Sequence, residues 1–343
     1  MRNAKILITG GAGYIGCVLV QKLMESKKMW SMMDFDTLED SRWKKTLADT
    51  FCFGWDKITV VDNLMYGQTP LSNYCYRGDF ELLVQDVRDQ KALLPLIEEA
   101  DIIIPLAAIV GFPACEQDKR LASETNYEHI KFICENKKPE AYVLYPNTNS
   151  GYGVGKEDEE CTEETPLNPI SHYGVTKCQA EDTVLEHGGI SFRLATVFGV
   201  SPRMRLDLLV NDFTYKAFSD KYIVLFEHKF RRNFIHVQDV ALAFMHGIKK
   251  YSTMKGNAYN VGLSSANLTK KQLAETIKKF VPSFSINYDE IQTDPDKRDY
   301  IVSNRKLEST GWRARYSLED GIVELLKAYP ILQKQLTTFT NLK

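Results

Sequence analysis

Residues 9–16 read TGGAGYIG and directly follow Lys5–Ile8, a largely apolar run typical of a β-strand. The glycines satisfy both the GxGxxG and the GxxGxxG spacing, and a helical pattern begins at Gly16. Glycines at these positions permit a tight turn, a close approach of the backbone to a pyrophosphate and close packing of a helix on a sheet. The N-terminus of the helix adds N–H groups and a partial positive charge. The stretch therefore predicts a dinucleotide-binding strand, loop and helix at the start of the chain.

The next expected element is an acidic residue at the end of the second strand, where it binds the hydroxyls of the adenosine ribose. Asp62 ends the run Ile58–Asp62 and fits this role. Its carboxylate would repel a 2′-phosphate, and no arginine follows within the next few residues, so the sequence favours NAD over NADP. Asp62 lies farther from the glycine loop than usual, and an unusual insertion at about 27–56 accounts for the excess.

Short β-branched runs alternate with longer helical patterns through the first half of the chain. The expected strands are Lys5–Ile8, Ile58–Asp62, Leu82–Val84, Asp101–Leu106, Ala141–Tyr145 and Ile190–Leu194. The expected helices include Gly16–Ser26, Gln90–Glu99, Leu121–Asn136 and, farther on, Asn267–Phe280. This alternation predicts an α/β fold with a Rossmann-type doubly wound parallel sheet in residues 1–200. A smaller mixed α/β lobe in residues 201–343 would lie across the carboxyl ends of the strands.

The composition excludes several classes of protein. The 343 residues are 44% hydrophobic and 26% charged, and 43 basic and 45 acidic side chains leave a net charge of −2. This near-balance argues against a general nucleic-acid coat and against a polybasic membrane-surface protein. The seven cysteines are scattered without CxxC spacing, which favours reduced thiols, and no metal site is expected. Without the pattern of a signal peptide or a transmembrane segment, we expect a cytoplasmic protein.

Tyr173 and Lys177 form a YxxxK pair at the start of an expected helix, and this spacing places phenol and ammonium on one helix face. A free tyrosine has a pKa of about 10, too high for a base at neutral pH, and a nearby lysine cation would lower it. Upstream, Tyr145–Gly153 reads YPNTNSGYG, a hydroxyl-rich loop at the edge of the sheet where ligands bind. The two motifs together predict general acid–base chemistry beside the cofactor.

These motifs resemble the extended short-chain dehydrogenase/reductase family, that is, the NAD-dependent epimerases, dehydratases and dehydrogenases of nucleotide sugars. The resemblance covers nearly the whole chain. It rests on the glycine loop, Asp62-Asn63, Asp86–Asp89, Leu106-Ala107-Ala108, Asn126, the loop after the fifth strand, Tyr173 with Lys177, Arg193–Gly199 and Arg232–Val240. The C-terminal lobe is then expected to bind the nucleotide sugar.

The resemblance implies a role for each matching residue. The expected catalytic residues are Thr148, Tyr173 and Lys177. The residues expected to bind NAD are Gly10, Gly13, Tyr14, Ile15, Gly16, Asp62, Asn63, Leu64, Asp86, Val87, Leu106, Ala107, Ala108, Asn126, Tyr173, Lys177, Leu194 and Ala195. The residues expected to bind the substrate are Thr148, Asn149, Thr196, Arg203, Arg205, Asn211, Arg232 and Arg298.

The arginines differ in how strongly the pattern supports them. By resemblance, Arg232 and Arg298 grip the substrate diphosphate, because two guanidiniums from different loops suit a group with several oxygens. Arg203 and Arg205 are explained equally well as solvated surface arginines, and that alternative stays open.

Two departures from the family pattern narrow the chemistry. Sugar 4,6-dehydratases place Asp-Glu directly after the catalytic threonine, because elimination of water needs an acid and a base, whereas this chain has Asn149-Ser150. Epimerase-reductases that resemble GDP-fucose synthase place a cysteine where Ser150 stands. What remains is oxidation of a sugar hydroxyl, reduction of a keto sugar, or 4-epimerisation by both in turn.

Two strings, Pro146–Gly153 and Arg203–Asp212, resemble the NAD-dependent dehydrogenases that oxidise C4 of a GDP-activated manno-heptose in bacterial capsule synthesis. The expected function is oxidation of a GDP-heptose to its 4-keto form for a capsular or surface polysaccharide. A nucleotide-sugar 4-epimerase or 4-keto reductase is the enzymatic alternative. An NAD-sensing scaffold is the non-enzymatic one, and the presence of Tyr173 and Lys177 disfavours it. We expect NAD as cofactor, a nucleotide sugar (GDP favoured) as partner, no nucleic acid, no membrane and a homodimer.

Overall fold

The computed structural model describes residues 3–32, 54–155, 159–289 and 298–333, so most of the insertion expected at 27–56 lies outside the described residues. A seven-stranded sheet forms the base of the molecule, and each pair of neighbouring strands is parallel. Its order is β11 (Asn257–Val261), β7 (Ile190–Leu194), β5 (Tyr142–Thr148), β4 (Ile102–Pro105), β1 (Ala4–Thr9), β2 (Trp55–Asp62) and β3 (Phe80–Val84). The order reverses at β1 and β4, which is where ligands bind in such sheets.

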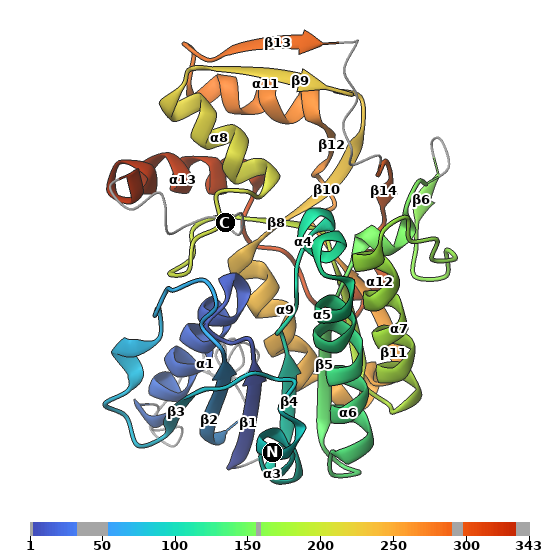
Figure 1. The fold of residues 1–343 in the computed structure, drawn as a ribbon. Coiled ribbons are helices and arrows are strands. Elements are labelled where there is room, and N and C mark those ends of the chain that lie inside the picture. Colours follow the sequence, from blue (N-terminus) through green and yellow to red (C-terminus); the bar gives the residue numbers. More distant parts are fainter. Residues whose placement is uncertain (1–2, 33–53, 156–158, 290–297, 334–343) are drawn as a thin grey trace, which may run out of the picture.

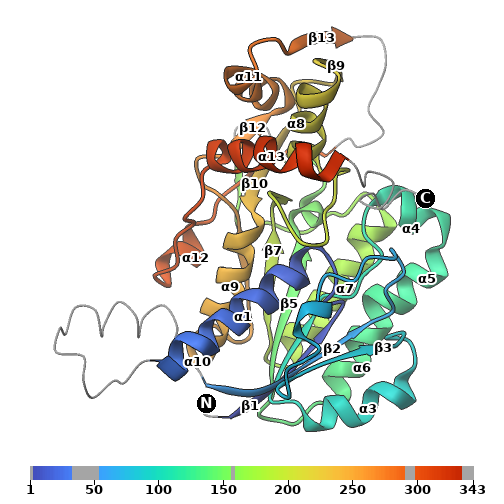
Figure 2. The same ribbon diagram turned by 90° about the vertical axis from the view of Figure 1, so that its left-hand side faces the viewer.

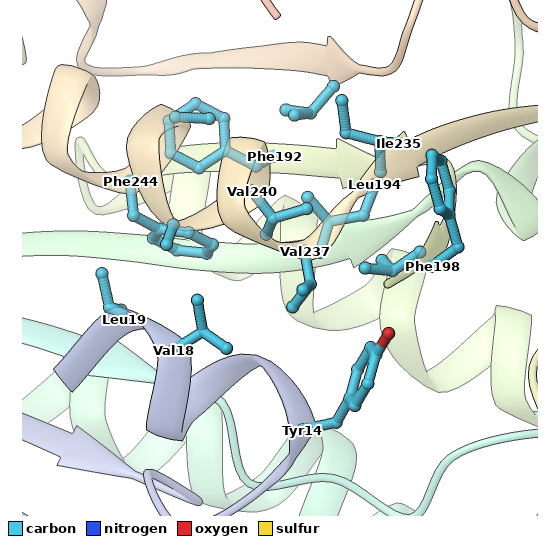
Figure 3. Packing of buried hydrophobic residues seen from close by; sticks show 14 of the residues in the cluster. Tyr14, Val18, Leu19, Phe192, Leu194, Phe198, Ile235, Val237, Val240 and Phe244 are labelled. Atoms are coloured by element: carbon cyan, nitrogen blue, oxygen red, sulfur yellow. The ribbon is translucent and has the colours of Figure 1, made fainter. Parts of the chain in front are cut away.

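Helices cover both faces of the sheet, because successive residues of each buried strand point to opposite faces. In β1, Ile6 and Ile8 join one apolar cluster and Leu7 joins the other. Figure 2 shows the helices on each side, with α1 (Tyr14–Met32), α9 (Val237–Lys249) and α10 (Tyr251–Met254) on one side and α3 (Gln90–Glu99), α6 (His129–Asn136) and α7 (His172–Glu186) on the other. Figure 3 shows Val18 and Leu19 of α1 facing side chains of α9, so these two helices pack together in the first cluster.

A smaller lobe lies at one end of the molecule, at the top of Figure 1. Its strands form a three-stranded mixed sheet and two parallel pairs: β8 (Thr196–Phe198), β10 (Arg231–His236) and β12 (Asn267–Thr269); β9 (Tyr222–Phe226) with β13 (Ser285–Asp289); and β6 (Glu160–Cys161) with β14 (Ile301–Val302). Its helices are α8 (Leu209–Ser219), α11 (Lys270–Phe280) and α13 (Leu318–Leu332), whereas α12 (Arg305–Ser309) lies below the lobe and contacts β11 of the large sheet. The shorter helical segments elsewhere are η1 (Ser72–Tyr74), α4 (Phe112–Gln117), α5 (Lys119–Ser123), η2 (Glu124–Glu128) and η3 (Asn149–Tyr152).

The expected fold class is confirmed, and three details differ from the expectation. The helix expected over Leu121–Asn136 is divided into α5, the π-helical turn η2 and α6. The helix expected over Asn267–Phe280 begins only at Lys270, because the three residues before it pair with β10. Beyond residue 200, α9 and β11 return to the large sheet. Before residue 200, β6 and β8 already belong to the smaller sheets. Residue 200 therefore does not separate the sheets, and as a domain limit it stays a prediction.

Candidate active site

A cavity of about 760 Å³ lies between the carboxyl ends of the large sheet and the smaller lobe. Gly10, Asp62, Leu106, Thr148 and Leu194 line it from the ends of five parallel strands or directly beyond them. The lobe contributes residues of β8, β10 and the loop before α8 to the opposite wall. Most of the expected site residues therefore face one cavity, although they are far apart in the sequence. They are Gly10, Gly13, Tyr14, Ile15, Gly16, Asp62, Asn63, Leu64, Asp86, Val87, Leu106, Ala107, Ala108, Thr148, Tyr173, Lys177, Leu194, Ala195, Thr196, Arg203, Arg205, Arg232 and Arg298.

The glycine loop turns tightly between β1 and α1. Gly10 has a φ of 69°, and a Cβ on it would lie 2.4 Å from the backbone nitrogen of Ala107. A Cβ on Gly16 would lie 2.6 Å from the backbone of Gly11, so both positions require glycine. Without these side chains the loop packs closely against Ala107 and against itself, and Gly13, Tyr14, Ile15 and Gly16 line the cavity. The N-terminus of α1 therefore borders the cavity, as a phosphate site needs.

Asp62 ties the end of β2 to this loop. One carboxylate oxygen accepts from the N–H of Ala12 at 3.0 Å, and the other accepts from the N–H of Leu64 at 2.9 Å. Burial raises the pKa of Asp62, whereas these backbone donors and the cation of Arg203 lower it. The carboxylate lines the cavity beside the glycine loop, where the ribose of an adenosine would meet it.

Asn126 is buried in the turn η2 and is not among the residues that line the cavity, so its contact with the cofactor stays a prediction. Its amide oxygen accepts from the N–H of Ile109 at 2.8 Å, and its amide nitrogen donates to the carbonyl of the same residue at 3.0 Å. The side chain thereby fixes the loop that follows β4, and that loop carries the lining residues Leu106, Ala107 and Ala108.

The expected catalytic side chains meet at the middle of the cavity. Tyr173 and Lys177 follow one another along α7, and the Tyr173 phenol is hydrogen-bonded to the hydroxyl of Thr148 at the end of β5. That hydroxyl donates to the Ser150 hydroxyl at 3.0 Å and accepts from the Ser150 N–H at 3.1 Å. Arg298 in turn donates to the Ser150 hydroxyl. The four groups form one chain of polar contacts from α7 to the lobe.

Burial dominates the protonation of the pair on α7. It raises the pKa of Tyr173 to about 12, and the neighbouring Cys115 raises it further, whereas Arg205, Arg298 and the hydrogen bond with Thr148 lower it. Burial also lowers the pKa of Lys177 to about 7. The Lys177 ammonium lies 4.1 Å from the centre of the Tyr145 ring, in a largely apolar setting. Near neutral pH the Tyr173 phenol is therefore protonated and neutral, whereas Lys177 is close to the midpoint of its titration.

Cations line the end of the cavity nearest the lobe. Arg232 of β10 is buried and lies with its guanidinium 5.7 Å from the centre of the Tyr300 ring. Arg298 donates to the hydroxyl of Ser150 in the loop that follows β5. Lys270, the first residue of α11, is a lining cation that the sequence reasoning missed. In the sequence it stands in an ordinary polar run before an amphipathic helix. It reaches the cavity because β12, which directly precedes it, pairs with β10.

Arg203 and Arg205 are not solvated surface arginines, which resolves the alternative left open by the sequence. Both line the cavity, and Arg203 is 3% exposed. The Arg203 guanidinium stacks 4.2 Å from the centre of the Tyr66 ring and interacts electrostatically with Asp62. Arg205 is paired with Asp207. Arg203 thus lies at the end that holds Asp62, and Tyr66 is a further lining residue that the sequence reasoning missed.

Two expected substrate residues lie outside the cavity lining. Asn211 is fully buried in α8, where its amide oxygen accepts from the N–H of Gly199 at 3.1 Å and its amide nitrogen donates to the carbonyl of Arg205 at 2.8 Å. These bonds connect α8 to the loop between β8 and α8, and a contact of Asn211 with the substrate stays a prediction. Asn149 is also buried, and among the described residues neither atom of its amide has a hydrogen-bond partner.

The described residues hold no cluster of three or more His, Cys, Asp or Glu side chains suited to a metal ion. None of the described helices is long and apolar enough to cross a membrane.

Known proteins share this architecture. A family model described as the NAD dependent epimerase/dehydratase family matches residues 6–262. UDP-glucuronic acid decarboxylase 3 of Arabidopsis thaliana is 27% identical over 335 residues, which cover 93% of this chain and 87% of that protein. dTDP-D-glucose 4,6-dehydratase of Mus musculus is 23% identical over 356 residues, which cover 95% and 88%.

Solved structures are similar over nearly their whole length. Pal from Bacillus thuringiensis superposes with a TM-score of 0.78 at 20% identity, covering 96% of this chain and 99% of that one. UDP-glucose 4-epimerase from Thermotoga maritima, solved with UDP-glucose, has a TM-score of 0.76 at 20% identity, with 96% and 99% covered. At this identity the likeness shows the fold.

Proposed function

The chain belongs to the NAD dependent epimerase/dehydratase family, and from that premise we propose that it is an oxidoreductase acting on C4 of a nucleotide-activated sugar. The observation that carries the proposal is the chain of hydroxyls formed by Tyr173, Thr148 and Ser150, with the Lys177 ammonium beside it and no carboxylate on the catalytic loop Thr148–Ser150. Oxidation of an alcohol needs one base and one hydride acceptor, and this set of groups provides the base.

The residues present fit NAD. A Cβ at either Gly10 or Gly16 would collide with backbone, and the start of α1 lines the cavity, where it suits a pyrophosphate. Asp62 lies beside them with a carboxylate suited to ribose hydroxyls. The Lys177 ammonium is buried against an aromatic ring and lines the same cavity, where it would bind the hydroxyls of the nicotinamide ribose. When bound, NAD supplies the hydride acceptor and a positive ring near Tyr173.

In the proposed oxidation, Tyr173 takes the proton of the sugar C4 hydroxyl while the hydrogen on C4 leaves as hydride, so that the products are a ketone, reduced cofactor and one proton. Thr148 hydrogen-bonds the same sugar oxygen. Burial keeps the pKa of Tyr173 near 12 although Arg205, Arg298 and Thr148 lower it, so the phenol needs a further positive charge to act as a base near neutral pH. A protonated Lys177 on the same helix face would supply one such charge, and the positive ring of bound NAD would supply another.

The absence of an acid on the catalytic loop supports oxidation over elimination. Elimination of water from C5 and C6 needs a second acid–base pair beside the sugar, and the two residues after Thr148 are Asn149 and Ser150, neither of which can exchange a proton near neutral pH. The acidic residues that line the cavity are Asp62, Asp86, Asp207 and Asp212. Asp62 accepts backbone N–H groups, and the other three are paired with Arg88, Arg205 and Lys216 respectively, so none offers an uncommitted carboxylate to the sugar.

Within this class we propose a GDP-activated heptose as the substrate and its 4-keto form as the product, for capsular or surface polysaccharide. The motifs Pro146–Gly153 and Arg203–Asp212 support that choice. Arg232, Lys270 and Arg298 form a cationic end that suits the diphosphate of a nucleotide sugar. We also propose a homodimer and a cytoplasmic location.

The test is incubation of the protein and NAD with a panel of nucleotide sugars in deuterium oxide, including GDP-manno-heptose and its hexose analogue. NMR should detect a keto or hydrated C4 carbon, and absorbance should detect reduced cofactor in equal amount. An inverted C4 alcohol without net NADH would instead indicate a 4-epimerase. Loss of water with a new C6 methyl group would overturn the role given to Asn149 and Ser150. Cofactor binding without turnover of any sugar would favour the NAD-sensing scaffold.

A further inference from the structure

A buried carboxylate lies on the catalytic helix, two turns beyond Tyr173. Tyr173, Lys177 and Glu181 are spaced four residues apart, so all three lie along one side of α7. Glu181 is 1% exposed and is paired with Arg193 of β7, which is 6% exposed. The Arg193 Nη2 lies 2.7 Å from Glu181 Oε1, and Nε donates to the same oxygen at 3.0 Å. The charges of this ion pair are therefore matched inside the protein.

The second oxygen of Glu181 faces the catalytic loop. Glu181 Oε2 accepts from Asn147 Nδ2 at 2.7 Å and from the Ser191 hydroxyl at 2.5 Å. Asn147 is itself buried, and its amide oxygen accepts from the N–H of Thr148 at 2.8 Å. The side chain of Asn147 thus connects the carboxylate on α7 directly to the backbone of the expected catalytic threonine.

The catalytic loop is in this way bound to α7 at two places. One is the hydrogen bond between the side chains of Tyr173 and Thr148. The other is the path from Glu181 through Asn147 to the Thr148 backbone. The first connects groups that face the sugar. The second runs through the buried side chains of Glu181 and Asn147, of which Asn147 also lines the cavity.

We propose that Asn147 is a positioning residue, which uses its hydrogen bond to Glu181 to hold the Thr148 hydroxyl at the distance from Tyr173 that a shared sugar oxygen requires. The proposal rests on the proposed function, because two hydroxyls must reach one oxygen only if that oxygen is oxidised or reduced. Small displacements of such groups are costly, since misplacement by about 1 Å can lower a rate about 100-fold.

The remainder of the network does not depend on Asn147. Without its amide, Glu181 keeps both contacts from Arg193 and the one from Ser191, so the buried carboxylate remains paired. Folding should therefore tolerate the loss, and the main effect should fall on Thr148. This separates Asn147 from residues whose removal would leave a buried charge alone.

A matched control exists on the other side of the same network. The Tyr152 hydroxyl accepts from Arg193 Nη1 at 3.0 Å and donates to the Asn260 amide oxygen at 2.7 Å. Tyr152→Phe thus removes a buried polar contact of the network without touching Asn147 or Thr148. It should lower the free energy of unfolding and leave turnover unchanged.

The experiment compares Asn147→Ala with Tyr152→Phe in kcat, KM, NAD affinity and the pH dependence of kcat. Asn147→Ala should lower kcat by about 10- to 100-fold, with KM and NAD affinity little changed. The rise of kcat with pH should move to higher pH, because the hydrogen bond between the side chains of Thr148 and Tyr173 lowers the pKa of Tyr173. The other groups that act on this phenol, Cys115, Arg205 and Arg298, stay in place in both variants.

A readout without substrate separates this proposal from the proposed function. Amide hydrogen exchange of the peptide containing Thr148 should become faster in Asn147→Ala and remain unchanged in Tyr152→Phe, even if no sugar is turned over by the wild type. An unchanged kcat and pH profile in Asn147→Ala, or an equal loss of kcat in Tyr152→Phe, would overturn the proposal. It would mean that the network stabilises the fold without positioning Thr148. If Asn147→Ala does not fold, Asn147→Ser, whose hydroxyl is too short to reach Glu181, should show the same loss of kcat.

Discussion

At the scale of single residues, the protonation of Tyr173 decides whether the site can work. Burial raises the pKa of this phenol to about 12, so the cofactor and nearby cations must lower it for catalysis near neutral pH. Tyr173→Phe keeps the ring and removes only the acid–base group. We expect a normally folded protein with unchanged NAD affinity and a turnover lower by about 10²–10⁴-fold. Steady-state kinetics with NADH absorbance and a fluorescence titration of the cofactor check both halves, and near-normal turnover would reject the assignment.

Arg203 and Arg232 offer a second test at this scale, because they lie at different ends of one cavity. Arg203 interacts with Asp62 and stacks on Tyr66, which places its charge at the cofactor end. A charge-assisted hydrogen bond contributes about 1.5–3 kcal/mol, so Arg203→Gln should weaken NAD binding about 10- to 100-fold and leave GDP binding unchanged. Arg232→Gln should do the reverse. Calorimetry with NAD and with GDP measures both affinities. A loss of GDP affinity in Arg203→Gln would show that Arg203 binds the substrate and not the cofactor.

At the scale of elements, the sequence predicts what is local and misses what depends on distant pairing. The strand ending at Ile8, the glycine loop and the pair Tyr173 and Lys177 carry their own patterns, and each lies where those patterns predict. The strand β11 reads NAYNV, and its buried Asn260 interrupts the apolar run that would have revealed it. Lys270 gave no signal either, because its place in the cavity depends on β12 pairing with β10. The amide of Asn126 forms two hydrogen bonds with the backbone of Ile109. A sequence alone cannot distinguish such a buried amide, which fixes a loop, from an amide that binds a cofactor.

The start of α6 carries a pH-sensitive element. His129 is 2% exposed, and burial lowers its pKa from 6.5 to about 4, with the Lys177 cation adding to the effect. Between these two values the unfolded chain binds a proton that the folded chain does not, so the free energy of unfolding falls as the pH falls from 6.5 toward 4. The share from this residue is on the order of 3 kcal/mol. Urea unfolding at several pH values should show a shallower decline in His129→Phe, whereas His187→Gln, at an exposed histidine, should follow the wild type.

At the scale of the whole molecule, buried hydrogen bonds connect the two sides of the cavity. The Tyr14 hydroxyl, on the first residue of α1, donates to the carbonyl of Gly199 at 2.6 Å. Asn211 of α8 binds the Tyr14 oxygen at 3.3 Å and also fixes the backbone of Gly199 and Arg205. The Tyr329 hydroxyl of α13 donates to the Asn211 carbonyl at 2.6 Å. One buried asparagine therefore joins the glycine-loop helix to two helices of the lobe.

Asn211→Ala should accordingly lower the free energy of unfolding, and its effect on the KM for the substrate should be secondary. It leaves the Gly199 N–H and the Arg205 carbonyl buried without their partner, at about 1–3 kcal/mol each, so we expect a loss of about 2–5 kcal/mol in the free energy of unfolding. NAD affinity should fall as well, because Tyr14 and Arg205 line the cofactor cavity. Tyr14→Phe removes one hydroxyl and should cost less, since Asn211 keeps its bonds to Gly199 and Arg205. Urea unfolding and NAD titration of the two variants measure this order. A raised KM for the nucleotide sugar with unchanged stability would mean that Asn211 touches the substrate, as its place in the sequence had suggested.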